Sequence, residues 1–191
     1  TGIDTVIVQM VQATYRDIQV SREGEWPWLI KKQSFTTTAG KCCYSLSDIF
    51  QSATNDLKEY KPQSVIIDNG TKKSYLMEID EDVMERRFLN SDAQGQPSLY
   101  SINYTDYSLE LREIPDVSYT VTFDYYQLPQ ELTLDNDVPL MPPAFHDVIV
   151  YKALERLSIY LSTPEIFQGY QVETDRMMGN LMRGTIKPKR I

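Results

Sequence analysis

The stretch from residue 124 to residue 161 is the feature that most constrains how this chain folds. It begins as a β-type segment, continues through an acidic connector rich in proline, and ends in a helical pattern. Pro142 and Pro143 suit the first turn of that helix, because proline has no N–H to lose there and its φ is already helical. Apolar residues then recur at four-residue steps, at Phe145, Ile149, Ala153, Leu157 and Leu161. This row predicts a helix buried against its own domain.

Both ends of the chain also predict helices. The segment from Asp4 to about Glu23 carries apolar residues at three- and four-residue steps, with Asp4 as the cap and Gly24 as the stop. A tight turn after residue 161 leads into a final helix, for which Thr163 is the expected cap and Gly184 the expected end. These helices and the one described above are expected to form one layer.

The middle of the chain is rich in short β patterns. Ser34 to Tyr44 predicts a hairpin, because β-branched and aromatic residues flank an Ala-Gly-Lys turn. Ser64 to Asp68 predicts a strand that ends in an Asp-Asn-Gly turn, and Lys72 to Ile79 predicts its partner. Asp80 to Leu89 reads as a short helix with its first residue as the cap. Ser45 to Leu57 is ambiguous between a loop and a helical turn.

Three strands follow in close order, at residues 98–104, 108–113 and 119–126. Apolar and polar residues alternate in the second and third, which predicts a meander with one dry and one wet face. The fold class is therefore α+β: a helical layer from the N-terminal helix and two long C-terminal helices, with an inserted antiparallel β block. We expect a single domain over residues 1–191. Its parts are a helical layer at 1–33 and 140–184, a β block at 34–126 and a basic tail at 185–191.

The charge pattern argues against a dedicated nucleic-acid-binding protein. The net charge is −8, whereas a protein held by phosphate contacts needs a basic face. The charge is also uneven: from Glu78 to Asp137 there are 14 acidic residues and three arginines, which gives −11. Such a segment is either a solvated acidic face or a functional surface.

Membrane and redox signals are weak. No run of 18 or more apolar residues occurs, so the sequence predicts no membrane span. The N-terminus lacks the layout of a signal peptide. The two cysteines, Cys42 and Cys43, are adjacent and form no disulfide framework. We expect reduced packing residues whose side chains point to opposite faces of a strand.

The sequence predicts no catalytic residue, no cofactor and no metal site. His146 is the one histidine, and its neighbour Asp147 diverges from it on a helix. The phosphate-binding glycine loops, the calcium loop and the serine-nucleophile motif are all absent. A hydrolase with paired carboxylates needs no sequence motif, so an enzyme stays open as the least favoured alternative.

Aromatic and basic residues supply candidate interface positions. Thirteen tyrosines among 191 residues fit either strands or surfaces that become interfaces. Trp26 and Trp28 flank a proline after the first helix, and either lock that helix onto the core or form a docking surface. The basic tail is either a frayed end or a segment that orders on docking. The candidate interface residues are Trp26, Trp28, Tyr125, Tyr126, Lys187, Lys189 and Arg190.

The order of motifs resembles the head-to-tail adaptor proteins of tailed bacteriophages, also described as head-completion or tail-tubular-A-like proteins. The likeness covers almost the whole chain. It is carried by Trp26–Leu29, Ser34–Leu46, Pro97–Ile102, Ser108–Asp116, Tyr119–Thr133 and Asp137–Leu154. The ordered series of strand, Tyr-Tyr, proline, acidic spacer, proline and helix is its most specific part.

The resemblance implies a structural virion protein at the head–tail junction, assembled in the host cytoplasm. It implies a homo-oligomeric ring, commonly of twelve subunits, that sits below the portal protein and carries tail or nozzle proteins. Genomic DNA would pass through the channel without specific binding, and the acidic segment would line part of the lumen. The basic tail would dock on an acidic groove of the portal. The alternative is a carbohydrate- or partner-binding β module of a phage tail or surface structure.

Overall fold

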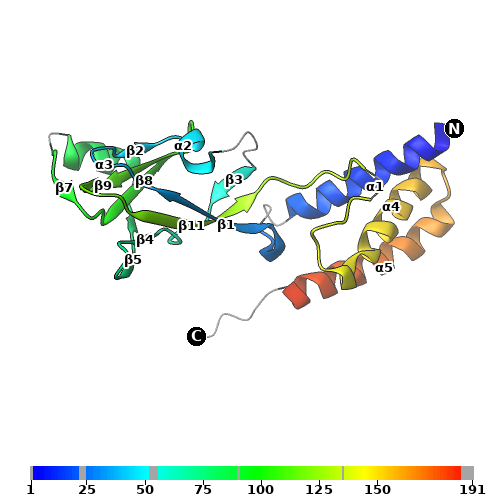
Figure 1. Cartoon of the computed structure of the whole chain (residues 1–191). Helices are drawn as coiled ribbons and strands as arrows, with labels where there is room; N and C mark the ends of the chain where they lie inside the picture. The colour runs from blue at the N-terminus through cyan, green and yellow to red at the C-terminus, as the bar shows by residue number, and fades with distance from the viewer. Residues whose placement is uncertain (1, 22–24, 52–55, 90, 135, 186–191) are drawn as a thin grey trace. The chain divides into compact units, whose positions relative to one another are not determined.

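The computed structural model describes residues 2–21, 25–51, 56–89, 91–134 and 136–185. The chain divides into two compact units (Figure 1). The helical unit comprises Thr1–Ile30 and Leu128–Ile191, and the β unit comprises Lys31–Gln127.

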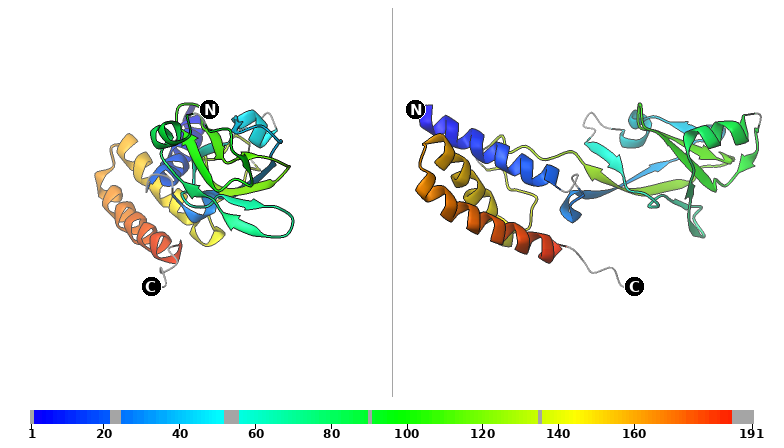
Figure 2. Two further views of the ribbon diagram at one scale, coloured as in Figure 1. Left: turned by 90° about the vertical axis from the view of Figure 1, so that its left-hand side faces the viewer. Right: turned by 180° about the vertical axis from the view of Figure 1, so that it is seen from behind.

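Three long helices build the helical unit: α1 (Gly2–Val20), α4 (Asp147–Tyr160) and α5 (Pro164–Thr185). α4 contacts both α1 and α5, and all the views show α1 and α5 running alongside it (Figures 1 and 2). The buried core of this unit draws on all three helices and their connections, at Tyr15, Ile18, Trp26, Leu29, Met141, Val148, Ile149 and Leu181. Full burial of each such aliphatic side chain contributes about 1.5–3 kcal/mol, so packing rather than helix propensity holds the unit together.

The starts of two helices differ from the prediction. α1 begins at Gly2, so Asp4 lies in its first turn and does not cap it, although its charge still suits the positive end of the helix dipole. Pro142 and Pro143 do not open α4. They lead into the 3-10 helix η3 (Pro143–Phe145), where the Phe145 N–H bonds to the Pro142 carbonyl at 2.9 Å, and α4 begins only at Asp147. The tighter i→i−3 bonds of this turn delay the α-helix.

The other helices are close to expectation. α5 includes Gly184 and ends one residue later. The predicted short helix exists as α3 (Glu81–Phe88), but its N-cap residue Asp80 makes no side-chain capping bond. The expected stop at Gly24 lies outside the described residues. The ambiguous stretch after Tyr44 contains α2 (Leu46–Phe50), and the 3-10 helix η2 (Pro27–Leu29) precedes the first strand.

Among the described residues of the β unit, the strands form two main sheets and one small strand pair. The first sheet has the order β1-β11-β4-β5, with β3 also paired to β11; its strands are β1 (Ile30–Thr36), β11 (Thr120–Gln127), β4 (Ile66–Asp68), β5 (Lys73–Tyr75) and β3 (Leu57–Tyr60). The second has the order β2-β9-β8-β6; its strands are β2 (Cys43–Tyr44), β9 (Ser108–Arg112), β8 (Leu99–Asn103) and β6 (Met77–Glu78). β7 (Gln94–Gly95) pairs with β10 (Ile114–Pro115) in parallel.

Two predicted strand pairings are wrong. The expected hairpin at Ser34 to Tyr44 does not form, because β1 pairs with β11 and β2 pairs with β9 in the other sheet. The expected three-strand meander forms only in its first half: β8 and β9 are antiparallel partners, but β11 joins the first sheet. The chain between β9 and β11 leaves the second sheet through β10. The pairing of β4 with β5 is confirmed.

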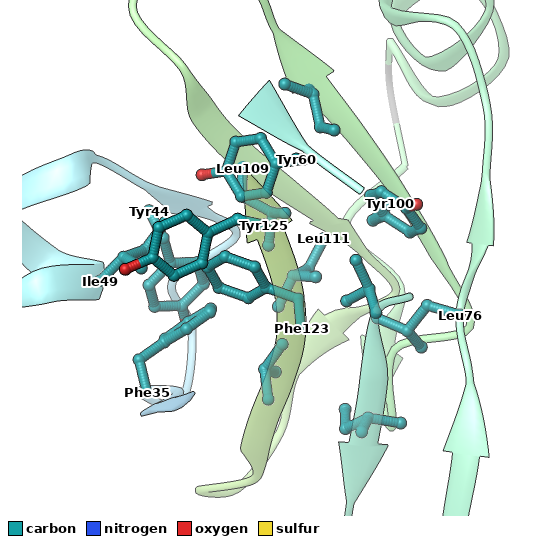
Figure 3. Packing of buried hydrophobic residues seen from close by; sticks show 14 of the residues in the cluster. Phe35, Tyr44, Ile49, Tyr60, Leu76, Tyr100, Leu109, Leu111, Phe123 and Tyr125 are labelled. Atoms are coloured by element: carbon teal, nitrogen blue, oxygen red, sulfur yellow. The ribbon is translucent and has the colours of Figure 1, made fainter. Parts of the chain in front are cut away.

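The inner faces of the two main sheets share one hydrophobic core of aromatic and aliphatic side chains (Figure 3). The alternation predicted for β11 is confirmed, since Tyr119, Val121, Phe123 and Tyr125 are buried and the residues between them are not. Tyr60 of the first sheet lies 5.0 Å from Phe123, measured between ring centroids. The α+β class is confirmed, with helices from both chain ends and antiparallel sheets inserted between them.

Candidate interface surfaces

The two tryptophans stack on each other within the helical unit. Their ring centroids are 4.3 Å apart and their planes differ by 21°. Trp26 is fully buried, and its indole N–H donates to the Ile18 carbonyl at 2.8 Å, so it ties the chain after α1 to the last turn of that helix. Trp28 is partly exposed. Of the pair, only Trp28 therefore has surface to offer a partner in the free chain.

The adjacent tyrosines of β11 point to opposite faces of the sheet. Tyr125 is buried and donates to the Asp56 carboxylate at 2.8 Å, whereas Tyr126 is partly exposed. Burial, and then the bond to Asp56, raise the pKa of the Tyr125 hydroxyl. Tyr125 thus serves the core of the β unit in the free chain, and Tyr126 is the one of the two with accessible surface.

The basic residues Lys187, Lys189 and Arg190 lie outside the described residues.

The acidic segment from Glu78 to Asp137 falls in both units. Several of its carboxylates already have partners: Glu78 accepts from Tyr100, Asp124 pairs with Lys61, and Asp137 accepts from the backbone N–H groups of Thr133 and Leu134. Much of this negative charge is therefore used inside the fold.

The helical unit presents an apolar groove between α1 and α4. The groove has a volume of about 120 Å³, and every side chain that lines it is apolar: Ile7, Met10, Val11, Val150, Ala153, Leu154 and Leu157. Its two exposed walls are Ile7 at 40 % and Val150 at 53 % exposure. We call this surface the α1–α4 groove.

More exposed apolar residues continue along α1 and α4. On α1, Ile3 and Val8 are 53 % and 54 % exposed, and at the end of α4 Ile159, Tyr160 and Leu161 are at least half exposed. Isolated exposed apolar residues are ordinary, but a run of them along two packed helices marks an interaction surface.

The apolar spacing of α4 predicted its buried side but did not reveal the groove. Ile149 and Ala153 are buried as predicted, but Leu157 lines the groove and Leu161 is half exposed, so the predicted buried stripe covers only the first part of the helix. The signal was available, because Val150 and Leu154 lie beside Leu157 on the helix and make its apolar surface wider than one row. One buried stripe against the chain's own core does not account for such a helix.

The histidine and the two cysteines are the residues whose side chains could take part in chemistry. The ring Nε2 of His146 lies 2.8 Å from the Met141 carbonyl oxygen, which fixes the partly buried imidazole within the helical unit. The prediction of opposite faces for the cysteines is wrong, since the Sγ atoms of Cys42 and Cys43 lie 3.3 Å apart. Cys42 precedes β2, so strand alternation does not apply to it.

Within the described part of the chain, no helix is both long and apolar enough to cross a membrane.

Comparison with known families gives one match over residues 2–189, to the family described as SU10 adaptor protein. No curated protein matches the chain.

Proposed function

Because this chain belongs to the SU10 adaptor protein family, a family of bacteriophage structural proteins, we propose that its copies form a ring below the portal of a phage head. The ring joins the head to the tail and extends the channel through which the genome leaves. Its neighbours are the portal protein on one side and tail or nozzle proteins on the other. The resemblance implies a ring of twelve subunits.

The observation that carries the proposal is the α1–α4 groove with the exposed apolar residues beside it. A ring contact is head-to-tail, so each subunit needs two different complementary surfaces. The groove supplies one of them. α5, which packs on α4, supplies a candidate for the other, with Ile166 and Val172 exposed at 51 % and 66 %. Burial of such surface contributes about 25 cal/mol per Å² and drives association.

Two variants of one residue type test this directly. Val150 in the groove and Val117 in the β unit are both 53 % exposed, so glutamate at either position leaves each core intact. We expect the wild-type chain and Val117→Glu to form rings when mixed with the portal protein, and Val150→Glu to stay monomeric, as measured by particle mass and negative-stain images. Ring formation by Val150→Glu at the wild-type protein concentration would remove the groove from the interface.

The acidic segment from Glu78 to Asp137 is proposed to line part of the channel. DNA that must slide through a channel is not held by negative side chains, because they repel the phosphates. Exposed carboxylates of this segment, such as those of Asp82 and Glu85 on α3, are the candidates. A ring structure in which these groups face outward would reject this part of the proposal.

The basic tail is proposed to dock on the portal. Deletion of Lys187 to Ile191 removes three positive charges without touching the described core. We expect the shortened chain to fold normally and to bind the portal more weakly, most clearly at low salt, where the attraction between charges is least screened. Equal retention of both chains on immobilised portal protein would discard this role.

The alternative, a carbohydrate- or partner-binding β module, is supported by the separate core of the β unit. It requires that the β unit carry the activity. In that case Val150→Glu and the tail deletion leave function unchanged, while changes at the exposed Tyr75 or Tyr104 abolish it.

A further inference from the structure

Three side chains with metal-ligating atoms converge at one edge of the β unit. The Sγ atoms of Cys42 and Cys43 and a carboxylate oxygen of Glu110 all lie within 4.8 Å of one another. The two sulfur atoms are 3.3 Å apart. Cys43 is exposed, and the other two residues are partly exposed, so an ion in solution has access to the cluster.

The sheet register explains this convergence. Cys43 of β2 stands directly opposite Glu110 of β9, and residues paired across two antiparallel strands project to the same face. Cys42 comes before the strand, and its carbonyl accepts a hydrogen bond from the Leu111 N–H at 2.9 Å. Its thiol is therefore free of the strand alternation and lies beside that of Cys43. β2 is the edge strand of its sheet, which leaves the cluster open.

The two thiols are poorly placed to form a disulfide with each other. Neighbouring Cα atoms across a trans peptide are about 3.8 Å apart, whereas disulfides usually join Cα atoms 4.4–6.8 Å apart. A bond between Cys42 and Cys43 would be strained and easily reduced. The pair therefore persists as a dithiol, which is the form that binds metal ions.

We propose that Cys42, Cys43 and Glu110 form a binding site for one thiophilic divalent cation, such as Zn²⁺ or Cd²⁺. Two thiolates and one carboxylate are a ligand set that such ions favour, and water fills the fourth tetrahedral position. Arg112 donates to the Glu110 carboxylate at 2.6 Å and so orients it. Binding releases both thiol protons to solvent, and the deprotonated ligands supply three negative charges to the ion.

Cysteine binds metal ions as the thiolate, so metal binding and proton release are linked. Because the ion must displace the protons, its affinity rises as the pH rises. The ion also ties β2 to β9 in the folded state alone, so it stabilises the β unit.

The test is a titration of the reduced, full-length chain with Cd²⁺, followed by the ultraviolet charge-transfer absorption of cadmium thiolates. Competition with a chromophoric chelator then gives the Zn²⁺ affinity. We expect one ion per chain, a higher melting temperature with Zn²⁺, and tighter binding at pH 8 than at pH 6. A ratio of two or more chains per ion would overturn the site as described.

Isosteric variants separate this site from any other. Cys42→Ser and Cys43→Ser should each weaken Zn²⁺ binding at least tenfold, and Glu110→Gln by about tenfold. Glu85→Gln, which removes an exposed carboxylate from α3, and His146→Gln should bind as the wild type does. Wild-type binding by the Cys42→Ser/Cys43→Ser double variant, or absence of binding by the wild type, would refute the proposal.

Discussion

Gln19 and Gln130 are joined by two hydrogen bonds that replace missing secondary structure. The side-chain amide of Gln19 donates to the Gln130 carbonyl at 2.9 Å, and its oxygen accepts from the Gln130 backbone N–H at 2.8 Å. Gln19 is fully buried on α1. These two bonds attach the connector between β11 and α4 to α1, much as paired backbone bonds join two strands. The attachment matters because the connector supplies Met141 to the core.

This clamp predicts the effect of Gln19→Met. Methionine keeps the length and volume of the side chain but leaves the Gln130 backbone groups without partners. We expect a loss of about 2 kcal/mol in the free energy of unfolding, because a buried polar group without a partner costs about 1–3 kcal/mol and these two backbone groups are partly buried. Chemical denaturation of the full chain measures this. Gln168→Met on the exposed face of α5 is the control, with an expected change below about 0.5 kcal/mol. Equal stability of both variants would contradict the clamp.

Two glycines of α5 are expected to respond differently to alanine. A Cβ at Gly169 meets open space, so Gly169→Ala should raise stability by about 1 kcal/mol through helix propensity. A Cβ at Gly184 would lie 2.9 Å from the Phe145 ring, so that ring must shift. We expect Gly184→Ala to show no gain, or a loss. Thermal unfolding of the two variants compares them, and an equal gain at both positions would show that Phe145 moves without cost.

The helices were the most predictable part of the fold, because their signal is local. A 3.6-residue apolar period needs no knowledge of the partner, and it placed α1, α4 and α5 within a few residues of their observed ends. The errors are at helix starts, where backbone turns such as η3 decide the boundary. The helical turn left open for the stretch after Tyr44 exists as α2, where Ser45 and Asp48 form a capping box, a pattern readable from the sequence.

Strand partners were much less predictable, for a physical reason. Alternation fixes which face of a strand is buried, and it did so correctly for β11, but it does not say which strand lies beside it. β6 completes the second sheet by pairing with β8 in parallel. No local sequence pattern predicts that pairing. The same limit hid the cluster of Cys42, Cys43 and Glu110, since it exists only through the β2–β9 register.

The candidate interface was predictable in type but not in place. Aromatic residues were expected to provide anchors, yet Trp26 and Tyr125 are buried in the two cores. Exposure depends on how helices pack, so the sequence could not assign Val150 to the α1–α4 groove. The apolar excess of α4 was the one clue.

The buried tyrosines predict an alkaline unfolding of the β unit. Burial is the largest cause that raises the pKa of Tyr60, Tyr100 and Tyr125 above the usual value of 10.0. The protonated forms therefore stabilise the fold fully below pH 10, and this contribution is lost as the pH rises toward the folded-state pKa values. Each tyrosine lowers the free energy of unfolding by about 1.4 kcal/mol per pH unit in that window.

Phenolate absorbance and circular dichroism, followed together above pH 10, check this. We expect a late rise in absorbance that coincides with loss of structure. Tyr60→Phe removes one of these groups and its bond to the Tyr107 carbonyl, so stability at pH 7 should fall by about 1 kcal/mol and its pH slope should become shallower. Tyr75→Phe, at a residue that is 72 % exposed, is the control and should leave the slope unchanged. Complete ionisation of all tyrosines while the protein stays folded would refute the link between the buried tyrosines and alkaline unfolding.

Asp48 predicts an acid-sensitive contact at the start of α2. The Lys41 ammonium, 2.7 Å away, and the Ser45 hydroxyl lower the pKa of the Asp48 carboxyl to about 2. Because this pKa is depressed, the stabilisation is present above the usual value of 3.8 and is lost as the pH falls through about 2. Carboxyl NMR titration of the folded chain measures it. Lys41→Met should raise the pKa of Asp48 toward 3.8, whereas Lys72→Met, in the exposed turn before β5, should not. An unchanged Asp48 titration in Lys41→Met would assign the shift to the Ser45 cap alone.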